Sequence, residues 1–270
     1  MKKNSLKTEQ KGQENGQIMG IKIDSSSMES VLTRVSDFVS HNSKFYIVTP
    51  NPELVLMAQK DRLLKNALNS ADLSIPDGVG LKLAIPDLNI IKGRELFTEL
   101  IKLAAKNNWK VFLLGGMGDE AALASRHLVS LYPNIFISHD KGPKINKDAE
   151  PASERDAKIQ SDVIAQINKF APQLLFVAFG NPKQEIWIHK QSLPLRGKNF
   201  PKLNIGGAMA VGGAFRYMAG TSKLPPKWMS GMGLEWLWRV FTEPYRLARI
   251  LNAVIVFPLK VFWEKIKTIF

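Results

Sequence analysis

Two short apolar runs, at 45–48 and 73–75, each end in polar residues of types that do chemistry. Thr49 and Asn51 follow the first run, and Asp77 follows the second. A helical pattern separates the runs, and strand, helix, strand is the unit that builds a parallel sheet. Ligands of such sheets bind outside the carboxyl ends of the strands. We therefore expect Thr49, Asn51 and Asp77 to face one crevice.

Asp77 is the candidate for acid–base work in this crevice. Its neighbours Gly78 and Gly80 leave the carboxylate unshielded on the ligand side. A general base must reach the proton that it removes, and such a position permits that reach. The Asp77-Gly78 pair is also a common turn sequence, which needs no catalytic role. The residues by themselves leave both interpretations open.

Two asparagine–proline pairs open helices directly after apolar runs. Asn51-Pro52 and Asn181-Pro182 each combine a capping residue with proline at the first helical position. A helix N-terminus at the end of a strand is an anion site. Gln184 and Glu185 lie in the first turn of the second helix, where they could contact a sugar hydroxyl or amide. Capping alone explains Asn51, and Glu185 could instead complement the helix dipole.

A glycine-rich turn at 116–121 fits the G-x-G-x-x-A pattern of dinucleotide-binding folds. It follows an apolar run at 110–114, and Asp140 ends the next such run. The pattern supports a nicotinamide- or flavin-dependent oxidoreductase as the alternative function. However, this motif usually opens a domain, whereas here it lies in the middle of the sheet. Gly116 and Gly118 could equally hold the diphosphate of a nucleotide sugar, or form a tight turn.

The last fifty residues combine cationic and aromatic side chains. Arg239, Arg246 and Arg249 are spaced so that a helix presents them on one face, and arginine binds phosphate in planar, bidentate geometry. Aromatic residues lie among them, and large apolar residues alternate with lysines beyond them. This combination is typical of a helix lying on an anionic membrane surface. From 223 to 270 there are eight basic and three acidic residues, a net charge of +5.

Strands alternate with helices through most of the chain. The sequence predicts strands at 18–23, 45–48, 73–75, 110–114, 135–138, 174–179 and 203–205, helices at 27–39, 93–107 and 159–170 and from 119 and 182, a helical pattern from 54 to 68, and a loop at 141–155. This alternation favours a Rossmann-like, doubly wound α/β fold with a mostly parallel sheet. The polar residues 1–17 are predicted to be disordered. A boundary at 221–228 separates an α/β catalytic domain, 18–220, from a membrane-associating helical appendage, 221–270.

Composition limits the function further. The chain has 270 residues, a formal net charge of +13 and a pI near 9.8, which implies an anionic partner. There is no cysteine, and the four histidines share no metal-ligand spacing, so we expect no metal site. Nucleic-acid binding is suggested by charge alone, and it leaves the patterns at Asp77 and Gln184 unexplained. Because neither a signal peptide nor a run of ~18 apolar residues is visible, the expected location is cytoplasmic.

Several segments resemble the WecG/TagA/CpsF family of bacterial glycosyltransferases, glycosyltransferase family 26. The matching segments, in chain order, are TPNPELVLMA, IPDGVG, FVAFGNPKQEIWI, GGAFRYMAG and LPPKWMSGMGLEWLWRVFTEPYRLAR. The resemblance implies inverting transfer of an N-acetylmannosamine-type sugar from a UDP-sugar donor. The implied acceptor is N-acetylglucosamine on a polyprenyl diphosphate lipid, in wall teichoic acid or related glycan synthesis.

The resemblance also implies roles for particular residues. Asp77 matches the position that the family proposes as catalytic base. The positions that match the substrate pocket, and the arginines of an appendage thought to complete the active site at the membrane, are Thr49, Asn51 and Gln184, and Arg239, Arg246 and Arg249. The implied enzyme is peripheral on the inner face of the cell membrane, and its oligomeric state, a homo-oligomer included, stays open.

Two departures from the family pattern bear on donor identity more than on reaction type. The family often has Arg-Val ahead of the glycine that matches Gly93, where this chain has Ile90-Ile91 with Arg94 close by. It also commonly has an acidic residue where this chain has Arg216. Because the chain has no Asp-x-Asp pair, a divalent metal need not hold the diphosphate. Arginines and helix N-termini, without a cofactor, are expected to offset the charge of the leaving group.

Overall fold

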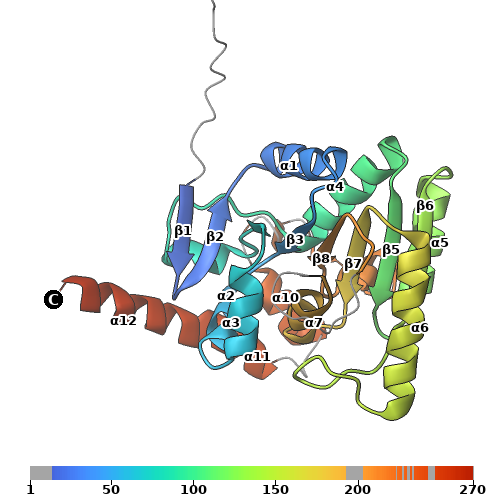
Figure 1. The fold of residues 1–270 in the computed structure, drawn as a ribbon. Coiled ribbons are helices and arrows are strands. Elements are labelled where there is room, and N and C mark those ends of the chain that lie inside the picture. The colour runs from blue at the N-terminus through green and yellow to red at the C-terminus, as the bar shows by residue number, and fades with distance from the viewer. Residues whose placement is uncertain are drawn as a thin grey trace, which may run out of the picture.

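A computed structural model of the chain describes residues 14–192, 203–222, 224–226, 228–229, 232, 234–242 and 247–269 (Figure 1). Within these residues, six strands form one sheet in the order β4-β3-β8-β7-β5-β6. Every neighbouring pair in the sheet is parallel. The strands are β3 (Phe45–Val48), β4 (Leu73–Ser74), β5 (Lys110–Gly115), β6 (Phe136–Asp140), β7 (Leu174–Ala178) and β8 (Gly207–Ala210).

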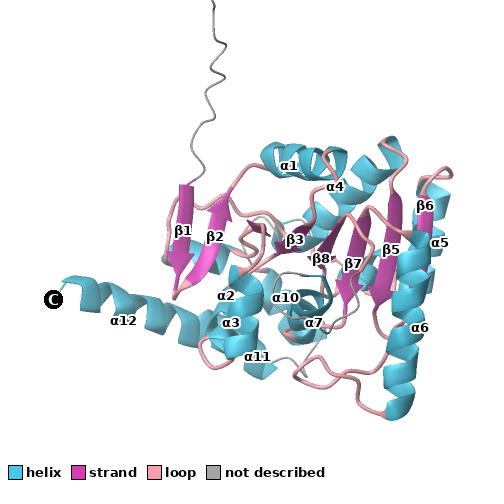
Figure 2. Ribbon diagram, in the orientation of Figure 1, coloured by secondary structure: helices cyan, strands magenta, loops and turns pink. Residues whose placement is uncertain are grey.

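Helices cover both faces of this sheet (Figure 2). One face packs against α1 (Met28–Ser40), α4 (Gly93–Lys106), α5 (Glu120–Leu131) and α8 (Ala214–Met218), which share one buried apolar cluster with it. The opposite face packs against α2 (Pro52–Ala58), α3 (Arg62–Asn69), α6 (Glu154–Phe170) and α7 (Lys183–Ser192) in a second cluster. The doubly wound α/β prediction is confirmed.

Burial on both faces explains why the inner strands read as unbroken apolar runs. All four residues of β3 and all five of β7 are buried. Short parallel strands of this kind need long crossover connections, and the helices supply them. The carboxyl ends of the strands therefore point to one edge of the sheet, where the candidate residues lie.

The N-terminal strand differs from its prediction. Residues 14–18 and 21–25 form an antiparallel hairpin, β1 (Glu14–Ile18) with β2 (Ile21–Ser25), rather than one edge strand at 18–23. The turn has positive φ at Met19 and Gly20. Because β1 takes in residues 14–17, ordered structure begins earlier than the predicted boundary at residue 18. The rest of the segment predicted to be disordered lies outside the described residues.

The last strand of the sheet also differs from its prediction. Leu203 and Ile205 are buried but lie outside any strand, and β8 starts at Gly207. A Cβ atom at Gly207 would lie 2.3 Å from the ring of Phe45 on the neighbouring strand. A glycine is therefore needed where the strand passes this ring, although glycine weakens strand propensity.

Two helix boundaries were also predicted inexactly. The helical pattern from 54 to 68 is two helices, because Asp61 starts α3 by accepting a hydrogen bond from Leu64 N at 3.0 Å. The loop predicted up to residue 155 ends sooner, since Ser153 caps α6 through Asp156 N at 3.1 Å. In both places a capping side chain sets the helix start.

The C-terminal appendage consists of α10 (Glu235–Thr242), α11 (Leu247–Leu251), the π-helical turn η3 (Asn252–Val256) and α12 (Phe257–Ile269). Phe257 and Val261 are buried in the same apolar cluster as α2 and α7, so the start of α12 is anchored to the domain. The rest of α12 projects from the body of the molecule (Figure 1). No helix among the described residues is long and apolar enough to span a bilayer.

Candidate active site

The exits of β3 and β4 bring Thr49 and Asp77 together at the start of α4. Asp77 N donates to Pro50 O at 2.8 Å, which joins the two exits. A Cβ atom built on Gly93 would lie 3.0 Å from Thr49 Oγ1 and 3.4 Å from Asp77 Oδ2. Both side chains therefore point at the first residue of α4. The predicted meeting of Thr49 and Asp77 is confirmed, and Asp77 is half-buried there.

Asn51 has the local role that its position predicts. Its Oδ1 accepts a hydrogen bond from Leu54 N at 2.9 Å, and Pro52 is the first residue of α2. The turn η1 (Val79–Leu83), which follows Asp77, packs on this proline, because a Cβ atom at Gly80 would lie 2.9 Å from Pro52 Cγ. The cap thus fixes the start of α2, against which η1 packs.

Gln184 links the exits of β7 and β8. Its side-chain oxygen accepts from Gly212 N at 3.0 Å and from Gly180 N at 3.3 Å. Its side-chain nitrogen donates to Asn181 Oδ1 and to Glu185 Oε1, each at 2.8 Å. The side chain is only 2% exposed, so both ends of its amide are satisfied within the protein. Gln184 therefore joins the segments that follow β7 and β8.

Glu185 carries a buried carboxyl group with a shifted pKa. It is 1% exposed, and Oε2 has no hydrogen-bond partner among the described residues. The pKa of Glu185 is raised from 4.5 to about 7: burial is the largest cause and the charge of Glu53 adds to it, while the hydrogen bond from Gln184 and the charge of Arg249 act in the opposite direction. With a pKa of about 7, this carboxyl group is partly protonated near neutral pH.

One arginine of the appendage reaches the strand ends. Arg249, in α11, pairs through Nε with the carboxylate of Glu53 in the first turn of α2. Its second guanidinium nitrogen lies 3.5 Å from the backbone oxygen of Asn181. Arg239 is part of α10, and Arg246 lies outside the described residues. Arg249 thus joins the segments that follow β3 and β7.

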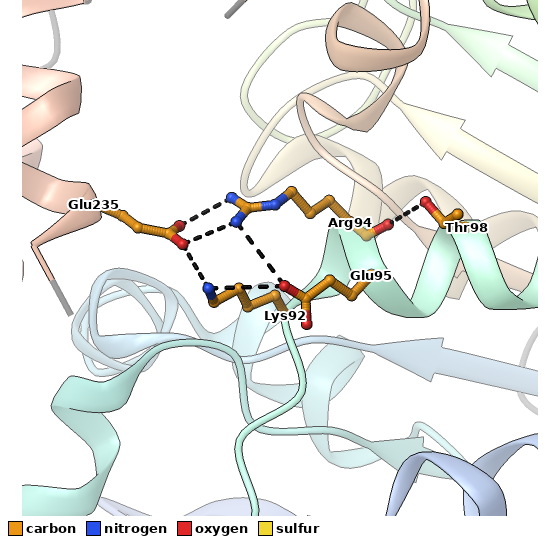
Figure 3. Close-up of polar contacts among 5 residues, drawn as sticks. All are labelled: Lys92, Arg94, Glu95, Thr98 and Glu235. Atoms are coloured by element: carbon orange, nitrogen blue, oxygen red, sulfur yellow. Dashed lines mark hydrogen bonds and ion pairs between the residues drawn. The ribbon is translucent and has the colours of Figure 1, made fainter. Parts of the chain in front are cut away.

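A second contact of the appendage was not predicted from the sequence. Figure 3 shows the carboxylate of Glu235, the first residue of α10, between Lys92 and Arg94 at the start of α4. Lys92 Nζ lies 2.6 Å from Glu235 Oε1, and the two terminal nitrogens of Arg94 lie 2.9 and 2.8 Å from the two oxygens. No local motif signals a pair separated by some 140 residues of chain.

The glycine-rich turn after β5 already holds a carboxylate. Gly116 and Gly118 both have positive φ, as a tight turn requires. Met117 N, between them, donates to Glu120 Oε2 at 2.8 Å, and Glu120 Oε1 lies 3.9 Å from Arg216 Nε. A negative charge therefore lies where a bound diphosphate would need donors, which weakens both diphosphate interpretations of this turn.

Among the described residues, no three or more His, Cys, Asp or Glu side chains are grouped so that they could hold a metal ion. At the strand ends, Thr49 and Asp77 meet beside Gly93, with Lys92 and Arg94 on either side of it. Gln184 and Glu185 are buried, so the predicted contact of these two side chains with a substrate is not open to them in this structure.

Comparisons with known proteins agree with this arrangement. The family described as "Glycosyl transferase WecG/TagA/CpsF family" matches residues 16–269. A protein of Staphylococcus aureus (strain MRSA252), named N-acetylglucosaminyldiphosphoundecaprenol N-acetyl-beta-D-mannosaminyltransferase, is 30% identical over 257 residues, which cover 93% of each chain. A protein of the same name from S. aureus (strain NCTC 8325 / PS 47) matches with the same identity and coverage.

Proposed function

The chain belongs to the WecG/TagA/CpsF family of glycosyl transferases, and from that premise we propose its reaction. It moves an N-acetylmannosamine-type sugar from a UDP-sugar to N-acetylglucosaminyl-diphospho-polyprenol, with inversion at the anomeric carbon. The similarity to the two S. aureus enzymes, whose names state this acceptor and this sugar, supports the choice. The product serves wall teichoic acid or related cell-surface glycan synthesis.

The observation that carries the proposal is the meeting of Asp77 and Thr49 at the start of α4. Asp77 takes the proton from the acceptor hydroxyl as that oxygen bonds to the anomeric carbon. The bond between this carbon and the diphosphate oxygen breaks, and UDP leaves with the electron pair. A single displacement of this kind inverts the configuration. Base catalysis by one carboxylate is typically worth ~10²- to 10⁴-fold in rate.

The leaving diphosphate needs positive charge close to Asp77. Arg249, which pairs with Glu53, supplies a guanidinium at the exits of β3 and β7, and the positive end of α2 lies beside it. Arg239 and Arg246 belong to the same proposal through their place in the sequence. We propose that these groups hold the diphosphate without a divalent metal or other cofactor.

The acceptor is a lipid, and the appendage has a surface suited to reach it. The large apolar side chains exposed on α10 to α12 are Trp236, Phe241, Leu247, Leu251, Val254, Ile255, Val256, Leu259, Phe262 and Trp263. Exposed lysines at 260, 265 and 267 lie among them on α12. We propose that this surface lies on the inner, anionic face of the cell membrane, which makes the enzyme cytoplasmic and peripheral.

The oxidoreductase alternative has less support. The family match favours glycosyl transfer. The turn that suggested a dinucleotide site uses Met117 N to bind the carboxylate of Glu120, so this donor is already taken. Saturable binding of NAD(P) to the purified protein would revive this alternative.

A donor panel tests the proposed function. The full-length protein is mixed with a short-chain N-acetylglucosaminyl prenyl diphosphate and, in separate reactions, UDP-N-acetylmannosamine and other UDP-sugars, each with and without EDTA. We expect transfer from the N-acetylmannosamine donor that persists in EDTA, and a product whose anomeric configuration, read by NMR, is opposite to that of the donor. Transfer from no UDP-sugar would refute the proposal, and strict Mn²⁺ dependence would refute the metal-independent mechanism.

A further inference from the structure

The carboxylate of Glu235 joins the start of α10 to the start of α4, and the proposed reaction assigns no role to this contact. It receives hydrogen bonds from Lys92 and, in bidentate geometry, from Arg94. The three side chains are between 19% and 24% exposed, so water screens the contact only in part. This is the type of ion pair that fixes geometry as well as contributing energy.

The cationic side of this contact is itself held in place. Thr98 Oγ1 donates to the backbone oxygen of Arg94 at 2.9 Å, and the Arg94 guanidinium lies 5.9 Å from the ring centre of Tyr217, which belongs to α8. Burial lowers the pKa of Arg94, but the hydrogen bonds and charge of Glu235 outweigh it, so the pKa lies above its usual value. Arg94, at the start of α4, therefore contacts both α8 and α10.

Lys92 and Arg94 are adjacent to the proposed base, Asp77. Lys92 and Arg94 flank Gly93, and Gly93 is the residue against which Thr49 Oγ1 and Asp77 Oδ2 are packed. The first residue of α10 is therefore tied to the two residues on either side of the point where Thr49 and Asp77 meet (Figure 3).

We propose that Glu235 is a positioning residue: by pairing with Lys92 and Arg94 it fixes the start of α10 beside Asp77, and so sets the arginine-bearing appendage in register with the base. This inference rests on the proposed function for its catalytic meaning, but the contact itself does not. Glu235 acts through the appendage and not on the substrate.

The charges support a positioning role over a binding role. A carboxylate facing a diphosphate substrate is repulsive, so Glu235 by itself would weaken binding of either substrate. Lys92 and Arg94 also lie 3.7 and 4.0 Å from the carboxylate of Glu95, so the two cations and the two carboxylates together carry no net formal charge. The pair therefore holds the appendage close without placing an uncompensated negative charge near the leaving group.

Steady-state kinetics of the full-length protein test the catalytic part. Glu235→Gln keeps the shape and removes the charge, and we expect kcat to fall about tenfold, or about 1.4 kcal/mol, with KM changed less than about threefold. Glu99→Gln is the matched control on α4, because Glu99 pairs with Lys102 at 2.7 Å on the exposed side of the helix. It should keep the wild-type rate. A wild-type rate for Glu235→Gln as well would overturn the proposal.

A distance measurement tests the positioning part without using activity. The chain has no cysteine, so spin labels at Lys106→Cys in α4 and Thr242→Cys in α10 form a unique pair. We expect a narrow distance distribution with Glu235 and a broad one with Glu235→Gln. A loss of turnover with an unchanged distribution would mean direct action on substrate and would overturn the proposal, as would a broadened distribution with unchanged turnover.

A double-mutant cycle separates pairing from independent roles. If Glu235 and Arg94 act through each other, Glu235→Gln with Arg94→Gln should be no slower than the slower single variant. Losses that multiply would overturn the proposal. If the wild-type protein transfers no sugar at all, the proposed function fails, and the spin-label distances still decide whether Glu235 holds α10.

Discussion

The α/β domain and the appendage use their apolar and charged residues in opposite ways. In the domain, apolar side chains fill two buried clusters, and the strand ends expose a few polar groups between them. In the appendage, large apolar side chains such as Phe262 and Trp263 are more than 60% exposed, while Glu235 and Arg249 turn inward to ion pairs with the domain. The domain is held together mainly by apolar packing, whereas the appendage combines a small buried anchor at Phe257 and Val261 with ion pairs to the domain.

Substitutions in the two regions should therefore have different effects. A change at the strand ends of the domain should alter the chemical step or the folding free energy, because burial sets the properties of these groups. A change in the appendage should alter docking or membrane binding and leave the folded domain intact.

Asp77 should show the largest effect. Asp77→Asn keeps the size of the side chain but removes the ability to accept a proton, so we expect turnover to fall by ~10²- to 10⁴-fold with an unchanged thermal midpoint. Asp87→Asn is the control, since Asp87 is exposed and lies ten residues further along the chain. Turnover by Asp77→Asn within a few-fold of wild type would show that Asp77 is not the base.

Glu185 should show the next largest effect, on stability rather than on rate. Its pKa is about 7 when folded and 4.5 ordinarily, so between these pH values the folded state binds more protons than the unfolded state. The free energy of unfolding should therefore fall as pH rises from 4.5 to about 7, by at most roughly 3 kcal/mol.

Denaturant unfolding at a series of pH values measures this. Glu185→Gln cannot ionise at this position, so it should lose that part of the pH dependence. Between pH 4.5 and pH 7, its free energy of unfolding should fall less than that of the wild type. Glu29→Gln on the exposed first turn of α1 should keep the wild-type slope. Parallel pH curves for Glu185→Gln and wild type would show that the buried carboxyl does not titrate as inferred.

The fold could be predicted from the sequence where burial leaves a local pattern. Runs such as 45–48 and 174–178 are apolar because both faces are covered, and this signal survives in one sequence. The strand at 207–210 was missed because its first residue must be glycine to pass under the ring of Phe45. That demand comes from a residue far away in the chain, so no local pattern reports it.

The site was predictable to the same extent. Strand ends of a parallel sheet share an edge, which is enough to bring Thr49 and Asp77 together. Two identical Asn-Pro pairs then behaved differently: Asn51 caps its helix, whereas Asn181 Oδ1 accepts from Gln184. The Glu235 contact could not be found, because ion pairs across the fold leave no spacing in the sequence. Tertiary contacts, and not propensity, decide these cases.

A substitution at Arg249 tests the contact of α11 with the segments after β3 and β7. Arg249→Lys keeps the positive charge but loses the planar fork that spans Glu53 and the backbone oxygen of Asn181. We expect turnover to fall about tenfold, with the thermal midpoint of the domain unchanged. Lys260→Arg, on the exposed part of α12, is the reciprocal control and should have no effect. A lowered thermal midpoint of Arg249→Lys would mean that this contact stabilises the folded domain itself.

The exposed apolar face of α12 should give the smallest effect of the series. Trp263 is 61% exposed, so its removal costs the fold little, but its contact with lipid is lost. We expect Trp263→Ser to lower the fraction bound to anionic liposomes by about fivefold, with soluble-acceptor turnover unchanged. Trp187→Phe makes the contrast, because Trp187 is buried and its Nε1 donates to Gln160 at 3.1 Å, so this change should lower stability and leave liposome binding alone. Equal sedimentation of Trp263→Ser and wild type would mean that the exposed face of α12 meets something other than the bilayer.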